Sequence, residues 1–387
     1  MEVEWKNTNS EKEKIYRKIF ENKYRFKLRE DRYEREFVIR NLESASEGKY
    51  SIIENPVWVG VKLTNRCNLQ CKHCWAIAKD YAPTLEEIKI MIDKLYKAHV
   101  KFIGFSGGEL FSRKDVLEIL SYAKTYNLIV EIFTNGTLLT PQILNSLEKI
   151  LDKKVDVIQI SLDGISEDAI NAQRGLKNSD KILVAIDELV KRKFVVRISY
   201  VVTSTNLYDL VPTFSLMEKV GVKGFSVSAV YPLNKGVIEY RKLDMEKYYE
   251  ELYKIICTQH TMEVQYFLQV DFFERVSKYI EKLTMTPRRT SDFESGYVSW
   301  FIDADGNVYP EFQLEYEELL GGNIYQDSIN DIVKNFSSMK LLANGRSLDK
   351  TECSKCMFKQ ICLNHSYDQS FEKYKEFNKK NPYCKMR

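Results

Sequence analysis

The chain has 387 residues, of which 44% are hydrophobic in a broad count, so it is long enough for one barrel-sized domain and a smaller one. The 58 Lys and Arg residues nearly balance the 55 Asp and Glu residues, which argues against a nucleic acid partner. Because no apolar run reaches the roughly 18 residues of a membrane span, and the polar N-terminus lacks a signal core, we expect a cytoplasmic protein with no membrane partner.

The cysteines fall into two groups along the chain. Disulfides are not expected in a long chain without a secretion signal, and the spacing favours two metal sites instead. The first group is Cys67, Cys71 and Cys74, the second is Cys353, Cys356, Cys362 and Cys384, and Cys257 stands alone.

The middle of the chain alternates between strand-type and helix-type patterns. Residues 1–50 are charged and rich in Tyr and Arg, with a capping-box pattern at Ser10 and Glu13 that favours a helix to about Phe20. Strands are expected at 57–64, 101–107, 128–136, 155–164, 195–203 and 224–230, and helices at 84–98, 113–126, from Pro141, 179–193 and 206–220. This alternation predicts an α/β fold, a partial (βα)6 TIM-like barrel whose site lies at the C-terminal strand ends.

The pattern changes after about residue 240. Residues 245–283 have a helical, aromatic pattern, 285–296 resemble a linker, and Asp305-Gly306 predicts a hairpin. We therefore expect an N-terminal extension at 1–50, a barrel core at 51–240, a helical linker region at 241–290 and a small C-terminal domain at 291–387.

The first cysteine group has the spacing C-x3-C-x2-C directly after the first expected strand. Three thiolates and a distant fourth ligand would make a zinc site. Alternatively, three thiolates hold three irons of a [4Fe–4S] cube and leave the fourth iron open to another ligand.

The segment CNLQCKHC resembles the motif of the radical S-adenosylmethionine (radical SAM) enzymes, and the likeness continues at later strand ends in SGGE (106–109), TNG (134–136) and SLDG (161–164). The resemblance implies that Gly107, Gly108 and Glu109 receive the methionine ammonium, and that Arg174 pairs with its carboxylate. It further implies ribose contacts from Ser161 and Asp163, an adenine contact from His73, and cofactor contacts from Thr134 and Asn135, with Thr203 and Asn206 as weaker candidates.

The activity implied by this resemblance is reductive cleavage of S-adenosylmethionine. One electron from the cluster breaks the sulfur–C5′ bond, and the resulting 5′-deoxyadenosyl radical abstracts hydrogen from a substrate. A flavodoxin- or ferredoxin-type protein is the expected electron donor.

The second cysteine group has four thiols, which on chemistry alone suit zinc or a [4Fe–4S] cluster. The stretches FIDADGNVYPE, GGNIYQDSINDIVKN and CSKCMFKQIC resemble a SPASM domain, which holds auxiliary clusters. Two expected cysteines are missing, because Glu311 and Ser366 stand in their places. The resemblance then implies one auxiliary [4Fe–4S] cluster on Cys353, Cys356, Cys362 and Cys384, hence two clusters in all. Glu311 could act as an iron ligand or substrate contact, although we expect a solvated side chain.

Substrate identity is the least determined feature. Relatives with a SPASM domain mostly modify peptides, so we expect a maturase of a ribosomally made peptide (cross-link, thioether or epimerisation), with a separate leader-recognition protein as a further partner. Alternatives are an enzyme acting on a small molecule or tetrapyrrole side chain, and a non-enzymatic zinc module. Cys257 is expected to be a buried structural thiol, with a role as hydrogen donor to a substrate radical as the alternative.

Overall fold

The protein is described from a computed structural model that places residues 56, 58–74, 76, 81–175, 180–267, 299–339, 352–355 and 367–384. The expected helix near the N-terminus, the linker at 285–296, Cys356 and Cys362 lie outside these residues.

One ten-stranded sheet runs through the molecule in the order β10-β9-β8-β1-β2-β3-β4-β5-β6-β7. Its central six strands are parallel and consecutive, which confirms the predicted partial barrel. They are β1 (Trp58–Lys62), β2 (Phe102–Ser106), β3 (Ile129–Thr134), β4 (Val157–Ser161), β5 (Val195–Val202) and β6 (Gly224–Ala229).

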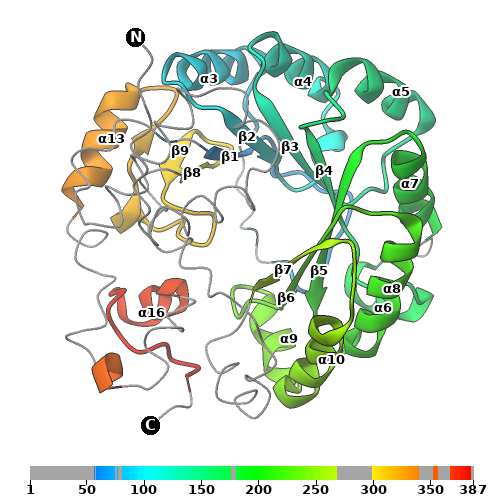
Figure 1. Ribbon diagram of the computed structural model, residues 1–387. Coiled ribbons are helices and arrows are strands. Elements are labelled where there is room, and N and C mark those ends of the chain that lie inside the picture. Colours follow the sequence, from blue (N-terminus) through cyan, green and yellow to red (C-terminus); the bar gives the residue numbers. More distant parts are fainter. Residues whose placement is uncertain are drawn as a thin grey trace, which may run out of the picture.

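Helices cover the outer face of the curved sheet (Figure 1). The helix α3 begins with the predicted capping box, in which Thr84 and Glu87 bond each other's backbone N–H, and α5 begins with Pro141 after the Thr140 cap. The helices of the barrel are α3 (Leu85–Lys97), η2 (Leu110–Ser112), α4 (Val116–Thr125), α5 (Pro141–Ile150), α6 (Glu167–Arg174), α7 (Asp180–Lys191), η3 (Leu207–Asp209), α8 (Leu210–Val220), α9 (Gly236–Lys242) and α10 (Met245–Cys257).

Two further strands extend the barrel sheet at its edges. The prediction of helix throughout 245–283 is wrong at β7 (Glu263–Phe267), which pairs parallel with β6. Its sequence EVQYF alternates polar and apolar residues, a strand pattern that the aromatic, charged surroundings obscured. At the other edge β8 (Ser299–Ile302) pairs parallel with β1, so the C-terminal region continues the barrel sheet.

The predicted hairpin at Asp305-Gly306 is confirmed. It joins β8 to β9 (Asn307–Tyr309), which pairs with β10 (Gly322–Asn323). The remaining described elements are η5 (Glu317–Leu319), α13 (Ile329–Ser338), η7 (Glu352–Lys355) and α16 (Tyr367–Tyr374). A buried ion pair of 3.0 Å joins Lys62 at the end of β1 to Asp303 at the end of β8. This ion pair therefore links the segment that leads into the first cysteine group to the start of the hairpin.

On β4 and β5, the side chains that face the inside of the barrel are partly exposed to solvent. Half-buried residues alternate with fully buried ones along both strands. Helices cover the outer side of these strands (Figure 1). The half-buried side chains include Gln159, Ser161, Arg197 and Ser199. Val157, Val195 and Val201 belong to the same half-buried set, so this lining mixes polar and apolar side chains, unlike the apolar core of a closed barrel.

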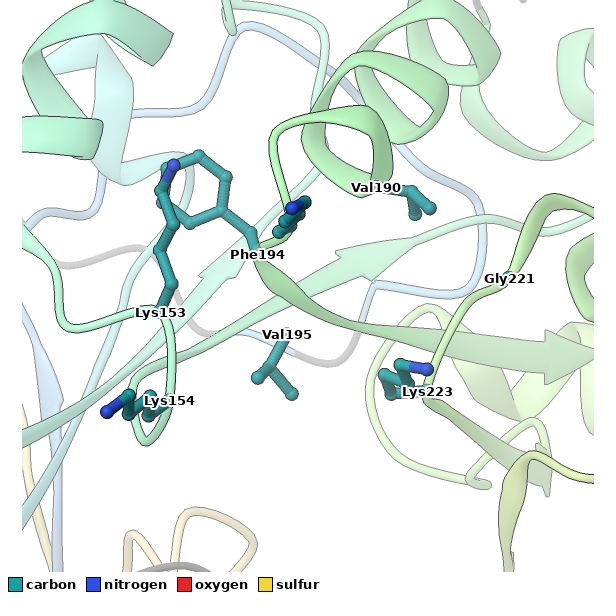
Figure 2. Close-up of a pocket in the computed structure, with 8 residues that line it drawn as sticks. Lys153, Lys154, Val190, Phe194, Val195, Gly221 and Lys223 are labelled. Carbon is teal, nitrogen blue, oxygen red and sulfur yellow. The ribbon is translucent and has the colours of Figure 1, made fainter.

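A cavity of about 440 Å³ lies at the opposite, N-terminal end of these strands. Figure 2 shows Lys153, Lys154 and Lys223 around it, together with Phe194 and Val195. Lys153 forms an ion pair of 2.6 Å with Glu148.

Among the described residues no helix is long and apolar enough to span a membrane.

Candidate active site

The first cysteine group follows β1 in a loop at the C-terminal end of the barrel strands, as predicted. Cys67 is exposed, whereas Cys71 and Cys74 are half-buried. The three thiols lie close together, since a charge on Cys74 would raise the pKa of both Cys67 and Cys71, and a charge on Cys67 would also raise that of Cys71. Burial raises the pKa of Cys71 to about 11, opposed by the nearby Arg174, so this group is a thiol at neutral pH unless a metal ion holds it as thiolate.

The cysteine loop lies directly against the SGGE segment. The N–H groups of Gly108 and Glu109 donate to the carbonyl oxygens of Thr64 and Arg66, each at 2.8 Å. A Cβ on Gly108 would lie 2.3 Å from the Arg66 oxygen, and one on Gly107 would lie 2.6 Å from the Thr64 oxygen. Both glycines are therefore needed for this close backbone approach.

Glu109 joins the ends of β2 and β3 through its buried carboxylate. It accepts hydrogen bonds from the Thr134 hydroxyl (2.7 Å), the Asn135 N–H (2.7 Å) and the Phe111 N–H (3.1 Å). Burial raises the pKa of Glu109, while these three donors and the charge of Arg174 oppose that rise. The expected ligands Glu109, Thr134 and Asn135 thus form one connected group.

We predict that Glu109→Gln destabilises the protein by about 1–3 kcal/mol. The amide NH₂ group would replace one carboxylate oxygen and would then face a hydrogen-bond donor that has lost its acceptor. The measurement is chemical denaturation of the wild type and the variant. Glu118→Gln is the control, because the exposed Glu118–Lys89 ion pair is worth at most about 1 kcal/mol. Equal losses in the two variants would show that the three donors do not depend on the carboxylate.

A second group comprises Asp163 just after β4, Arg174 at the end of α6 and His73 in the cysteine loop. The Asp163 carboxylate is completely buried and lies 2.7 Å from the Arg174 guanidinium. It also accepts from the Val201 N–H (3.1 Å) and lies 3.5 Å from His73 Nε2. Burial lowers the pKa of His73 although Asp163 opposes this, so the ring is neutral at pH 7.

Gln173 links this group to the cysteine loop, a role that sequence analysis missed. Its carbonyl oxygen accepts from the Lys72 N–H at 2.9 Å, and its side-chain oxygen lies 3.2 Å from His73 Nδ1. Its amide donates to Thr205. The residue directly precedes Arg174 in the sequence, and this position was the available signal.

The weaker candidates Thr203 and Asn206 form hydrogen bonds next to the second group. The Asn206 side chain donates to the backbone oxygen of Asp163 (3.0 Å) and accepts from the Thr203 N–H (2.7 Å). Both residues are almost fully buried. They fix the backbone that carries Asp163.

Asn68 is a further residue that sequence analysis missed, although it lies within the cysteine motif. Its side-chain oxygen accepts from Asn135 Nδ2 at 2.9 Å, and its amide donates to Thr137. The TNG segment therefore holds the cysteine loop. Ser161 lies half-buried at the end of β4, without a side-chain role that the structure defines.

Three cysteines outside this loop belong to the described residues. Cys353 and Cys384 are half-buried in the C-terminal region. The expectation of a buried Cys257 is wrong: this thiol is exposed at the end of α10, because the buried face of the helix includes Leu252 and Ile255, and Cys257 lies about 200° around the helix from Ile255. Its alternative role as hydrogen donor stays a prediction.

Comparisons with known proteins agree with this geometry. Residues 61–218 match the Radical SAM superfamily, and residues 294–357 match the SPASM iron-sulfur cluster-binding domain. The AdoMet-dependent heme synthase of Methanosarcina barkeri is 26% identical over 85% of this chain and 96% of its own length. The mycofactocin maturase MftC of Mycobacterium tuberculosis is 26% identical over 80% of this chain and 78% of its own.

A solved structure shows the same fold. The crystal structure of Streptococcus suis SuiB bound to its precursor peptide SuiA superposes with a TM-score of 0.69 at 16% identity, covering 88% of this chain and 79% of that one. The cysteine loop, the strand-end groups and the two matched domains together show that the chain is a radical SAM enzyme with a C-terminal SPASM domain.

Proposed function

We propose that Cys67, Cys71 and Cys74 hold a [4Fe–4S] cluster and that the two strand-end groups bind S-adenosylmethionine. When bound, the cluster supplies the electron that cleaves the cofactor to a carbon radical. Glu109 supplies negative charge for the methionine ammonium, and Arg174 supplies a cation for its carboxylate. Asp163 acts as a positioning residue that orients the guanidinium.

The residues fit this cofactor in two respects. Arg174 is 5% exposed, and its Nε atom has no hydrogen-bond partner, so one buried donor is available to an anionic ligand. Among the residues that the structure places, no three Cys, His, Asp or Glu side chains are spaced to hold a single metal ion. In a cube each thiolate binds a different iron, which needs wider spacing than one zinc ion does.

The SPASM domain is proposed to hold one further cluster on Cys353, Cys356, Cys362 and Cys384. Reconstituted protein should then contain about eight irons and eight sulfides, two cubes of four. Quantification of iron, sulfide and zinc checks this, with a Cys353→Ala/Cys356→Ala variant expected to lose about half of the iron. About twelve irons in the wild type would mean a third cluster, and stoichiometric zinc would mean a zinc site in the tail.

The substrate is proposed to be a ribosomally synthesised peptide. The solvent-accessible inner face presents uncharged polar side chains, among them Gln159 and Ser199, which match the N–H and C=O groups of a peptide backbone. Its cations are paired, Arg197 with Glu263 at 2.9 Å and Lys62 with Asp303. This lining supports a neutral or cationic substrate over a polyanionic one. SuiB, whose fold is similar, was solved bound to the precursor peptide SuiA, and the similar MftC is named a maturase.

A tetrapyrrole side chain is the second candidate, because the heme synthase of M. barkeri aligns along nearly its whole length with this chain. Tetrapyrroles of that kind carry several carboxylates, which need basic partners in a binding site. The paired state of Lys62 and Arg197 argues against this candidate.

A direct assay separates the two substrates. Reconstituted protein is incubated anaerobically with S-adenosylmethionine and dithionite, or with a flavodoxin or ferredoxin as alternative donor. The substrates tested are a candidate precursor peptide, sought among the neighbouring genes, and an iron porphyrin bearing propionates. We expect mass spectrometry to show a peptide that has lost two hydrogens per bond formed, or has gained deuterium from heavy water on epimerisation. Loss of carbon dioxide from the porphyrin and an unchanged peptide would reject the proposal.

A further inference from the structure

A group of buried and half-buried polar side chains lies where the chain leaves β6 and meets the hairpin and α16. We call it the acidic site, and it comprises Tyr231, Glu311, Gln313, Asp368 and Gln369. Burial raises the pKa of Tyr231, and the charges of Asp368 and Glu311 raise it further, which places both carboxylates near the phenol. Gln313 lies within hydrogen-bonding reach of the same hydroxyl.

Asp368 is the central member of the acidic site. It is 5% exposed, and its Oδ2 atom has no hydrogen-bond partner. Among the described lysines and arginines, none forms an ion pair with it. Burial, followed by the charge of Glu311, raises the pKa of Asp368 to about 7. The carboxylate accepts backbone hydrogen bonds, including one from Gln369, but Oδ2 has no partner, so this buried oxygen can still take a ligand.

Two neighbours of Asp368, Gln313 and Gln369, also have a buried side-chain atom without a hydrogen-bond partner. The Gln313 side-chain oxygen has no hydrogen-bond partner, and neither has the side-chain nitrogen of the buried Gln369. The other end of the Gln369 amide accepts from Asn381 at 2.9 Å, which fixes its orientation. The acidic site therefore offers two unused acceptor atoms, Asp368 Oδ2 and Gln313 Oε1, and one unused donor, Gln369 Nε2, beside a second carboxylate.

The chemistry of these atoms selects the kind of ligand. Unused acceptors and negative charge require a cation that donates several hydrogen bonds, such as a protonated amine with three donors or a guanidinium with five. A metal ion suits the site less well, because among the described residues no three Cys, His, Asp or Glu side chains are spaced to hold one. Glu311 also stands at the hairpin position where a SPASM domain has a cysteine, so this chain presents a carboxylate there instead of a thiolate.

We propose that the acidic site binds the side-chain cation of a Lys or Arg residue in the peptide substrate. This inference rests on the proposed function and adds to it a charge requirement on the peptide. The site lies after the C-terminal end of β6, at the same end of the barrel as the cysteine loop. A cation bound there would fix the register of a peptide that enters the barrel from this end.

The first test is the stability of Asp368→Asn. Because Oδ2 has no partner, removing its charge relieves the repulsion from Glu311 and should leave the thermal unfolding midpoint of the reconstituted protein unchanged or higher. Glu376→Gln, an exposed change close to α16, is the matched control. A clearly lower midpoint for Asp368→Asn alone would show that the carboxylate holds the fold together, and it would overturn the proposal.

The second test is calorimetric titration of the full-length, reconstituted protein. The probes are the Nα-acetyl methylamides of lysine, arginine and norleucine, of which the last is uncharged. We expect a cationic probe to bind at least about tenfold more tightly than the norleucine probe, a difference of 1.4 kcal/mol. Asp368→Asn and Glu311→Gln should remove this preference and Glu376→Gln should keep it. Equal binding of all three probes, or a preference that persists in Asp368→Asn, would overturn the proposal.

The two proposals fail in distinguishable ways. Binding of the cationic probes requires no turnover, so it can be observed even if no peptide is modified, in which case the peptide function alone fails. If a peptide is modified but replacement of each of its Lys and Arg residues by norleucine leaves its KM unchanged, the acidic site alone is refuted.

Discussion

Replacing Cys67, Cys71 and Cys74 together by alanine will abolish the formation of 5′-deoxyadenosine from S-adenosylmethionine. The reason is that this loop provides only three thiolates and so leaves one iron open to the cofactor, whereas the proposed C-terminal set provides four. The measurement is 5′-deoxyadenosine after anaerobic reconstitution and reduction with dithionite. Activity should fall to the level of a reaction without protein.

The iron content provides the control for this variant. The C-terminal cluster should persist, so about four irons of eight should remain. Cys257→Ala, which removes an exposed thiol on α10, should retain the full iron content and cofactor cleavage. Undiminished 5′-deoxyadenosine from the triple variant would contradict the assignment of this loop.

Arg174→Met will be strongly destabilising and will also weaken the binding of S-adenosylmethionine. It leaves the fully buried Asp163 carboxylate without its guanidinium, and loss of one member of a buried ion pair costs about 3–5 kcal/mol. The double variant Asp163→Asn/Arg174→Met removes the isolated charge and should recover most of that stability. Chemical denaturation measures both variants.

Cofactor binding separates the structural role of this pair from its proposed ligand role. In both variants the dissociation constant for S-adenosylmethionine should rise at least about tenfold, equivalent to 1.4 kcal/mol. Arg192→Met is the control, since Arg192 lies on the surface beside Glu148 and should change stability by at most about 1 kcal/mol. If the stable double variant binds the cofactor like the wild type, Arg174 serves the fold alone.

The barrel could be predicted from the sequence because its signals are local. The six core strands are short and rich in apolar residues, and capping residues such as Thr84 and Thr140 mark helix starts. The strand β7 was missed because its alternation covers only five residues within an aromatic, charged region, and pairing with β6 holds it in place. The pairing of β8 with β1 joins residues about 240 positions apart, which no local signal reveals.

The residues of the candidate site were found because their motifs stand at strand ends, but their contacts were not. The sequence resemblance suggested separate cofactor contacts for Asp163 and Arg174, whereas the structure pairs them with each other. Gln173 and Asn68 carry no distinctive motif of their own, and their roles follow from hydrogen bonds across 100 and 67 positions of the chain. The acidic site likewise depends on the meeting of three segments that are distant in sequence.

The most direct measurement of the central claim is the transfer of deuterium from the peptide to the cofactor. The precursor peptide is prepared with fully deuterated side chains and backbone carbons, and the 5′-deoxyadenosine from an anaerobic reaction is analysed by mass spectrometry. If the protein abstracts hydrogen from the peptide, deuterium will appear in 5′-deoxyadenosine in proportion to modified peptide. Unlabelled 5′-deoxyadenosine, formed in equal amounts with and without the peptide, would contradict the account.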